Sequence, residues 1–396
     1  MSTHRSAWMG HVAGSSMLML VLAFSASKDN VSRSDSMSHY YVATKGNDSN
    51  DGSASRPWAT IQHASAVIGP GATVHVAAGI YNLGTITTTT SGTASARIHY
   101  VSDTQWGAKI VGSGDTVWYN SGNYVDIRGF DITGSNRATR LGINSEASHV
   151  RILNNHVHGI QATGGGNRGG AGISTGWTPG AGYTGTDNDV IGNVVHDIAF
   201  ATAGHQVHGI YYSGPGGHIL NNLVYGCQAW GIHLWHQATG ITIANNTVFE
   251  NGYGGITVGG DSTTGVVNDH TIVSNNIVYH TVRGIYEWDS TGLHNRYLNN
   301  LVSGSSSFTI RLNHGLTPRG GIASSPQFVN YVSSGTGDPT WYRSHFQLAA
   351  GTNPAVDTGT SEGAPGNDID GGARPFQKRH DLGAYERGAP PAAWPW

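Results

Sequence analysis

The sequence predicts an all-β protein folded as a single-stranded right-handed parallel β-helix. Three observations predict this fold: a short segment with an Asn-Asn pair recurs along the chain, a Gly-Ile pair recurs between its copies, and glycine supplies 58 of 396 residues. That glycine share is about twice the ~7% of an average protein. The repeated segments alternate apolar and polar positions and are rich in β-branched residues, which is typical of strands.

The first repeated element is the Asn-Asn segment, for example at residues 150–157 and 241–248. Its second Asn, or the single Asn of one degenerate copy, falls at positions 155, 193, 222, 246, 276 and 300. Steps of 24 to 38 residues between these positions indicate a solenoid. Asn tolerates the left-handed backbone of a tight corner, and its amide can bond neighbouring backbone. We therefore expect the Asn side chains of successive coils to stack as a ladder.

The second repeated element is the Gly-Ile pair, found at Gly142-Ile143, Gly172-Ile173, Gly209-Ile210, Gly231-Ile232, Gly255-Ile256 and Gly284-Ile285. The segment 308–310 takes its place in the last turn. Each coil then holds two strands around the Asn corner and a third at the Gly-Ile pair. A single coil cannot bury its own apolar face, so stacking must create one continuous core.

Composition excludes several classes of protein. Charged residues make up only 11% of the chain and the net charge is −3, which argues against a nucleic-acid partner. Thirty-six aromatic residues are too many for a disordered chain. Cys227 is the only cysteine, so the chain forms no internal disulfide.

The chain divides by composition into four parts. The apolar run 17–24, followed by small residues, predicts an export signal over 1–27, with a polar linker over 28–39. Residues 40–320 form the β-helix with a capping helix at 60–68, and residues 321–396 form a loop-rich C-terminal cap and tail. We expect a secreted or periplasmic bacterial protein that is monomeric and leaves the membrane once its signal is removed.

Several segments carry a family resemblance. Residues 40–53, 57–62, 69–81 and 91–98 resemble the N-terminal part of exported right-handed β-helix proteins, and segments 368–375 and 381–386 resemble ones that recur in the same group. The chain thus resembles the pectate-lyase-like superfamily over most of residues 40–386. This resemblance implies the β-helix fold, whereas the reactions in that superfamily include elimination, hydrolysis and epimerisation.

Strand alternation predicts an exposed groove along the Gly-Ile strands. The Ile points inward, so outward positions of successive coils collect polar and aromatic side chains that suit a sugar polymer: Tyr211, His233, Trp235, Tyr286, Trp288, Arg311 and Asn313. The residue before each Gly, such as His208 and Arg283, is expected on a corner that faces the groove. His236 and the long loops 160–171, 174–188 and 199–207 lie beside it.

These residue types suit β-elimination at a uronic acid, which needs a base, an acid and a positive charge on the carboxylate. His208 and His233 are the candidate bases, Tyr211 the candidate acid and Arg283 the neutralising cation. Substrate would bind to Tyr286, Trp235, His236, Trp288, Arg311 and Asn313. Many related lyases use a Lys or Arg base with calcium, yet no lysine lies in 150–320 and acidic residues are sparse there. No cofactor is required, and calcium remains an alternative.

Two other functions stay open. A glycoside hydrolase on the same groove would use Glu287 with Asp261 or Asp289, because hydrolysis needs two carboxylates about 5–9.5 Å apart. Alternatively, the chain is a non-catalytic carbohydrate-binding surface protein. The sequence assigns no metal ligands.

Overall fold

The computed structural model describes residues 38–135, 138–161, 169–178, 182–199, 204–331 and 345–394. The expected export signal and nearly all of the linker lie outside these residues. No helix in the described ranges is both long enough and apolar enough to cross a membrane.

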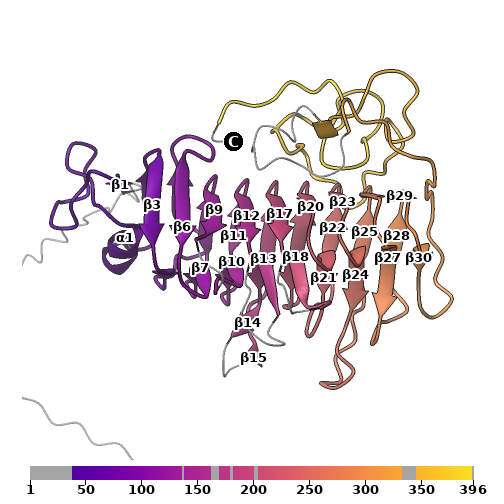
Figure 1. Ribbon diagram of the computed structural model, residues 1–396, viewed down its shortest axis with the longest axis horizontal. Helices are drawn as coiled ribbons and strands as arrows, with labels where there is room; N and C mark the ends of the chain where they lie inside the picture. The colour runs from indigo at the N-terminus through magenta and orange to yellow at the C-terminus, as the bar shows by residue number, and fades with distance from the viewer. Residues whose placement is uncertain are drawn as a thin grey trace, which may run out of the picture. The chain divides into compact units, whose positions relative to one another are not determined.

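The described chain winds through three parallel sheets, and each coil adds one strand to each sheet (Figure 1). Sheet 1 contains β1 (His39–Val42), β2 (Thr73–Val76), β5 (Ile98–Ser102), β8 (Val125–Arg128), β11 (Arg151–Leu153), β16 (Asn188–Ile191), β19 (Gly217–Leu220), β22 (Thr242–Ala244), β25 (Ile272–Ser274) and β28 (Arg296–Leu298). Sheet 2 contains β4 (Ile86–Thr88), β7 (Thr116–Asn120), β10 (Leu141–Ser145), β13 (Gly170–Thr175), β18 (Val207–Tyr212), β21 (Trp230–Leu234), β24 (Gly254–Gly259), β27 (Arg283–Trp288) and β30 (Phe308–Arg311). Sheet 3 contains β3 (Gly79–Leu83), β6 (Ala108–Gly112), β9 (Asp131–Gly134), β12 (His156–Ile160), β17 (Val194–Ile198), β20 (Leu223–Tyr225), β23 (Thr247–Phe249), β26 (Ile277–Tyr279) and β29 (Leu301–Ser303). A short antiparallel hairpin, β14 (Trp177–Thr178) with β15 (Gly182–Tyr183), projects beside sheet 2.

The expected Asn ladder is confirmed. Side-chain hydrogen bonds of 2.9–3.1 Å run from Asn155 to Asn193 and onward through the same position of each coil, namely Asn222, Asn246, Asn276 and Asn300. Each Nδ2 group also donates to a backbone carbonyl, as that of Asn246 does to Ile219 at 2.8 Å. The corner between sheet 1 and sheet 3 is thus held by a continuous row of buried amides.

The Gly-Ile pairs build sheet 2, and a break in its regular alternation explains the glycine. Val207 and Ile210 both lie in the core, although strict alternation would place them on opposite faces. The ladder between β18 and β21 starts at Ile210 and leaves Gly209 out. A Cβ on Gly209 would lie 2.4 Å from the Val224 side chain, so two consecutive residues face inward and only glycine fits.

This break corrects the expectation of a corner before each Gly. His208 lies inside β18, which begins at Val207, and so the strand does not start at the glycine. His208 still points outward, because the extra inward residue at Gly209 resets the alternation. The direction of His208 was therefore predicted for the wrong physical reason.

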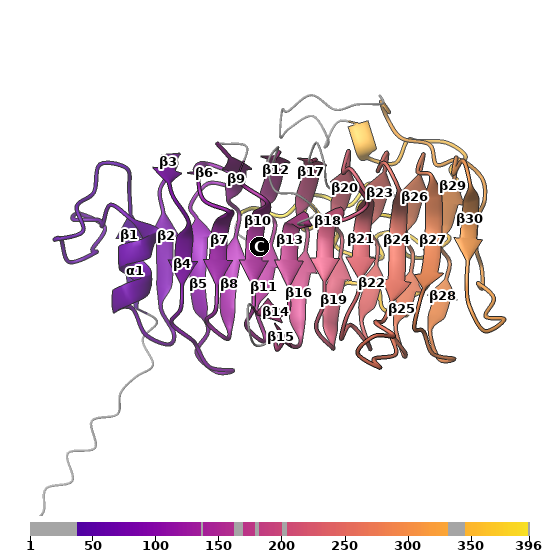
Figure 2. The same cartoon turned by 60° about the horizontal axis from the view of Figure 1, so that its bottom comes forward.

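A helix covers the N-terminal end of the stack, as expected. Helix α1 spans Ile61–Val67 and lies against the first coil (Figure 2). Its N-cap is Thr60, whose hydroxyl accepts a hydrogen bond from the backbone of His63 at 3.0 Å. Ile61 and Ala64 of this helix are fully buried against the coil.

The sequence predicts that the C-terminal residues form a cap and tail at the end of the stack. The described residues 345–394 also cover earlier coils. They pack against the outer face of sheet 3, where the Phe346 ring contacts Phe249 at a tilt, with ring centres 4.1 Å apart. The first Asn of several pairs holds this segment: Asn245 Nδ2 donates to the Asp381 carbonyl at 2.8 Å. The Trp394 indole donates to the Ser102 carbonyl at 3.0 Å, so the segment extends back to the early coils.

Candidate functional site

The outer face of sheet 2 carries a column of polar and aromatic side chains, as the sequence predicts. Parallel pairing places Tyr211 beside His233, His233 beside Thr257, and Thr257 beside Tyr286. Arg311 follows at the end of the column. Adjacent strands lie about 4.8 Å apart, so these side chains form one continuous surface.

A pocket of about 890 Å³ opens on this face. We call it the histidine pocket, and its lining includes six side chains from the column and its neighbours: His208, Tyr211, His233, Trp235, His236 and Trp288. All six were named from the sequence as candidate site residues. The pocket has the size of a typical ligand site, ~300–1,000 Å³.

Two neutral imidazoles form the floor of the histidine pocket. His233 Nδ1 and His208 Nε2 are 3.1 Å apart, and both residues are more than nine-tenths buried. Burial lowers the pKa of His208 to about 3 and that of His233 well below its ordinary value. The other two ring nitrogens, His208 Nδ1 and His233 Nε2, are buried without a hydrogen-bond partner.

The hydrogen bond between the two rings determines the protonation of the two free nitrogens. Two neutral imidazoles carry two N–H groups, and the bond between His208 and His233 uses one of them. The ring that donates has a lone pair on its free nitrogen, and the ring that accepts has its N–H there. The pair thus always presents one proton acceptor and one proton donor.

Tyr211 completes the group. Its ring stacks on His208 with centres 5.2 Å apart and meets His233 edge-on at 5.4 Å. Burial raises the pKa of the Tyr211 phenol far above its ordinary value, so the hydroxyl stays protonated. Tyr211 is partly exposed and the free imidazole nitrogens are buried, so a ligand in the pocket can contact Tyr211 before it reaches them.

Aromatic side chains form one wall of the histidine pocket. The rings of Trp235 and Trp288 lie 5.4 Å apart, and Trp288 is 38% exposed. His236 stacks on Tyr183 with ring centres 3.8 Å apart, and its Nδ1 lies 2.9 Å from Asp261 Oδ2. Asp261 therefore holds His236 in place at the rim.

Four predicted site residues lie outside the histidine pocket. The Arg283 guanidinium stacks on the Tyr253 ring at 3.8 Å, so the structure does not bring it to the histidine pair. Tyr286 and Arg311 continue the column beyond Thr257, with Arg311 lying over the Phe308 ring at 4.1 Å. Asn313 bonds to Thr291 at 2.8 Å.

The predicted hydrolase pair is not assembled on the groove. Glu287 points inward and is 1% exposed, with Oε1 accepting from Asn295 and Tyr297 and Oε2 from the backbone of Asn313. A buried carboxylate with these partners holds a turn together and does not face a substrate. Asp289 accepts hydrogen bonds from Ser262 on the surface.

Sequence reasoning missed Arg140, the one arginine or lysine among the described residues that line the histidine pocket. It bonds Asp115 through Nε and Nη2, both at 2.6 Å, and the Gly169 carbonyl through Nη1. Two of its N–H groups remain for a ligand. The signal was present, because Arg140 directly precedes an earlier Gly-Ile strand than those from which the column was read.

Glu146 was missed in the same way. It follows β10, whose Asn144 pairs with Ser174, and Ser174 pairs in turn with Tyr211 of the column. The Tyr119 hydroxyl donates to Glu146 Oε2 at 2.6 Å, while the buried Oε1 has no partner. Burial raises the pKa of this carboxyl group.

A calcium ion does not fit the histidine pocket. Calcium takes six to eight oxygen ligands, with carboxylates prominent among them. No Asp or Glu occurs among the described residues that line the pocket. The alternative of a calcium-assisted reaction therefore has no ligand set at this position.

The fold and this groove define a parallel β-helix protein with a concave aromatic and histidine-rich face. Residues 40–300 match the family model described as "Pel9A-like, right handed beta helix region", and the chain belongs to that family. The resemblance to the pectate-lyase-like superfamily is thereby confirmed.

Individual relatives are more distant. The structure of pectate lyase Pel9A aligns with a TM-score of 0.56 at 20% identity, covering 89% of this chain and 98% of that one. A rhamnogalacturonan lyase aligns with a TM-score of 0.54 at 18% identity, covering 72% and 87%. Uncharacterized protein YwoF of Bacillus subtilis (strain 168) is 26% identical, over 67% of this chain and 74% of its own length. At these identities the solved structures show a shared fold.

Proposed function

We propose that the protein is a polysaccharide lyase that cleaves a uronate-containing polymer by β-elimination. The observation that carries the proposal is the His208–His233 pair, whose two free nitrogens are buried and unpartnered beside Tyr211. Buried polar atoms without partners are rare in proteins and need an explanation. A substrate that exchanges protons with these two nitrogens would explain why they lack partners. Neighbouring side chains must shift to admit that substrate.

The proposed reaction uses each group once. The lone pair of the histidine pair removes the proton at C5 of the uronate, and the electrons form a C4–C5 double bond. The bond from C4 to the glycosidic oxygen breaks, and the Tyr211 hydroxyl protonates the leaving oxygen. Arg140 pairs with the carboxylate and stabilises the negative charge that develops on it.

Binding of the substrate would raise the pKa of His208 and so make it a stronger base. A free imidazole with a pKa of about 3 is a weak base, and catalysis is most effective when the pKa lies near the working pH. A uronate carboxylate bound beside His208 favours its protonated form and raises that pKa. An uncharged sugar has no such effect, which makes the acidic polymer the preferred substrate.

Substrate class and location follow from the same features. Trp235 and Trp288 offer flat apolar faces for sugar rings, and the column extends past them to Arg311, as a polymer requires. The solved relatives include a pectate lyase and a rhamnogalacturonan lyase by name. We also infer export of a monomer, because the apolar run 17–24 has the character of a signal and such polymers lie outside the cell.

The test is incubation of the protein with pectate, alginate, glucuronan and rhamnogalacturonan, followed by ultraviolet absorbance of the unsaturated product. Tyr211→Phe and His233→Gln are expected to lower the rate at least 100-fold, within the range that proton-transfer groups contribute. Tyr279→Phe, on sheet 3, is the matched control and should keep the wild-type rate. Equal rates for Tyr211→Phe and Tyr279→Phe would contradict the assigned acid.

Hydrolysis is the second candidate, favoured by Glu146. A buried carboxyl group with a raised pKa and an unpartnered oxygen has the character of a general acid. New reducing ends without ultraviolet absorbance, lost in Glu146→Gln and kept in Tyr211→Phe, would establish hydrolysis and overturn the lyase.

A further inference from the structure

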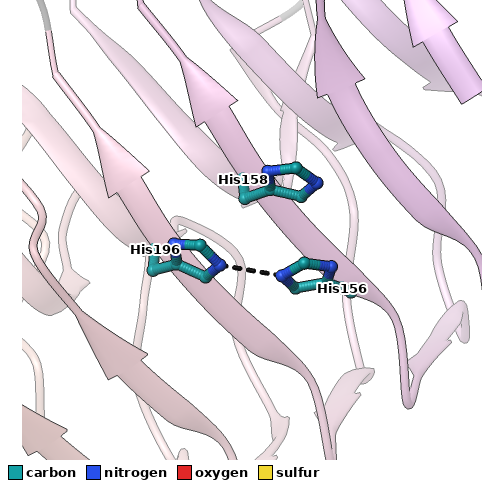
Figure 3. Close-up of side chains that lie close together, drawn as sticks. All are labelled: His156, His158 and His196. Atoms are coloured by element: carbon teal, nitrogen blue, oxygen red, sulfur yellow. Dashed lines mark hydrogen bonds between the residues drawn. The ribbon is translucent and has the colours of Figure 1, made fainter. Parts of the chain in front are cut away.

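Three histidines converge on the outer face of sheet 3, which is a different sheet from the one that carries the histidine pocket. His156 and His158 lie on β12, and His196 lies on the neighbouring strand β17 (Figure 3). One nitrogen of each ring lies within 4.8 Å of a nitrogen of the other two. Figure 3 shows the His156 and His196 rings facing each other, with the His158 ring alongside. The two facing Nε2 atoms are 2.7 Å apart.

Carboxylates set the protonation of all three rings. Asp131 lies 3.2 Å from His156 Nδ1 and 3.0 Å from His158 Nε2, and Asp197 lies 2.9 Å from His196 Nδ1. An ionised carboxylate only accepts hydrogen bonds, so each of these ring nitrogens carries the proton. The remaining nitrogen of each ring is then unprotonated and carries a lone pair.

Neither of the two facing nitrogens then carries a hydrogen that it could donate to the other. His156 Nε2 and His196 Nε2 would face each other at 2.7 Å with two lone pairs, which repel unless a cation lies between them. Histidines whose outer nitrogen is held by a carboxylate are the usual arrangement around a bound metal, because the carboxylate orients the ring and strengthens the ligand.

We propose that His156, His158 and His196 bind one zinc ion. Imidazole nitrogen suits zinc and not the hard cations magnesium and calcium, which take oxygen ligands. With Zn–N distances of ~2.0–2.1 Å and tetrahedral angles, two ligand nitrogens lie about 3.3 Å apart, so His156 and His196 need to separate by roughly 0.6 Å. The His158 ring stacks on His156 with ring centres 4.2 Å apart, so it also has to turn before its free nitrogen points at the same ion.

The surroundings fit a metal that joins two coils. His156 and His196 are 0% and 1% exposed, the Tyr225 ring stacks on His196 at 4.7 Å, and the Trp106 ring lies 5.5 Å from His156. The His158 side chain is 21% exposed, which gives the ion an entry path and leaves the fourth position to water. The zinc would hold β12 and β17 together from outside the core.

The experiment measures metal in the full chain. Protein is stripped with a chelator, given zinc chloride, passed over a desalting column and assayed by inductively coupled plasma mass spectrometry. We expect one zinc per chain and a higher melting temperature than in the stripped protein. His158→Ala and His196→Gln should lose the zinc and the shift in melting temperature. Cobalt in place of zinc should give the visible absorption of a tetrahedral site.

A matched control comes from a second cluster, Asp269–His270–His294, in which both histidines are exposed. His294→Gln should keep the bound zinc and the melting-temperature shift. Loss of zinc in His294→Gln but not in His158→Ala would overturn the proposal, as would a wild-type protein that retains none. His158 is partly exposed, so His158→Ala tests the site even if His196→Gln fails to fold. Lyase activity plays no part in these measurements, so this proposal and the proposed function fail independently.

Discussion

Asn246→Ala removes one member of the amide ladder and is expected to destabilise the protein strongly. Asn246 Nδ2 donates to the Ile219 carbonyl and to Asn276 Oδ1, at 2.8 and 2.9 Å. Its Oδ1 accepts from the backbone and side-chain nitrogens of Asn222, both at 2.9 Å. All of these groups are buried, so water cannot replace the lost partner.

The expected loss follows from the count of bonds. The four shortest of its buried hydrogen bonds, at about 0.5–1.5 kcal/mol each, correspond to about 2–6 kcal/mol of unfolding free energy. The control is Asn82→Ala on β3, an exposed position where a change within about 0.5 kcal/mol is expected.

The measurement is urea unfolding followed by far-ultraviolet circular dichroism. Amide hydrogen exchange would report Asn222 N–H separately, since that group loses its side-chain acceptor. If Asn246→Ala unfolds within about 0.5 kcal/mol of Asn82→Ala, the ladder does not stabilise the stack and the bond count is wrong.

Three further predictions concern packing, pH and the aromatic wall. Gly231→Ala should cost about 1–3 kcal/mol in a thermal melt, because its Cβ would lie 2.4 Å from Val248, whereas Gly69→Ala meets open space. Burial lowers the pKa of His208 from 6.5 to about 3, so between these values the unfolded chain binds more protons than the native protein. Stability should therefore fall as the pH drops from about 6.5 towards 3, by the order of a few kcal/mol, and His208→Gln should flatten the slope in acid-unfolding curves. Trp288→Ala should weaken polysaccharide binding about tenfold, equivalent to about 1.4 kcal/mol, in isothermal titration.

Each of these predictions has a clear contrary result. Equal melting temperatures for Gly231→Ala and Gly69→Ala would show that the core accommodates the methyl group. A slope between pH 6.5 and 3 that is the same with and without His208 would show that this imidazole titrates normally in the native state. Unchanged binding by Trp288→Ala would place the polymer elsewhere.

The repeating parts of the molecule were predictable because each coil has the same residue types at the same structural positions. Asn222 and its equivalents mark one corner, and Ile210 and its equivalents mark the inward face of sheet 2. With the register known, the alternation of strands then places Tyr211, His233 and Tyr286 in one column.

The non-repeating parts escaped prediction because neighbours decide them. Arg283 occupies the same place in its strand as His208, yet the Tyr253 ring one coil earlier binds its guanidinium through a cation–π contact. Arg140 reaches the histidine pocket only because two later coils stack upon its strand. The three histidines of sheet 3 escaped prediction because His196 lies about 40 residues after the other two, and only the pairing of β12 with β17 brings them together.

The attachment of residues 345–394 along sheet 3 has a consequence for biosynthesis. Phe249 and Tyr225, from coils made early, depend on Phe346 to cover their rings, and Ser102 receives its bond from Trp394 near the end of the chain. Contacts so distant along the chain form slowly, since a long loop must close first. A ribosome that stops before residue 345 would release a stack with an uncovered apolar flank, ready for proteases or chaperones. The apolar flank of sheet 3 is therefore covered only after residues 345–394 have been synthesised.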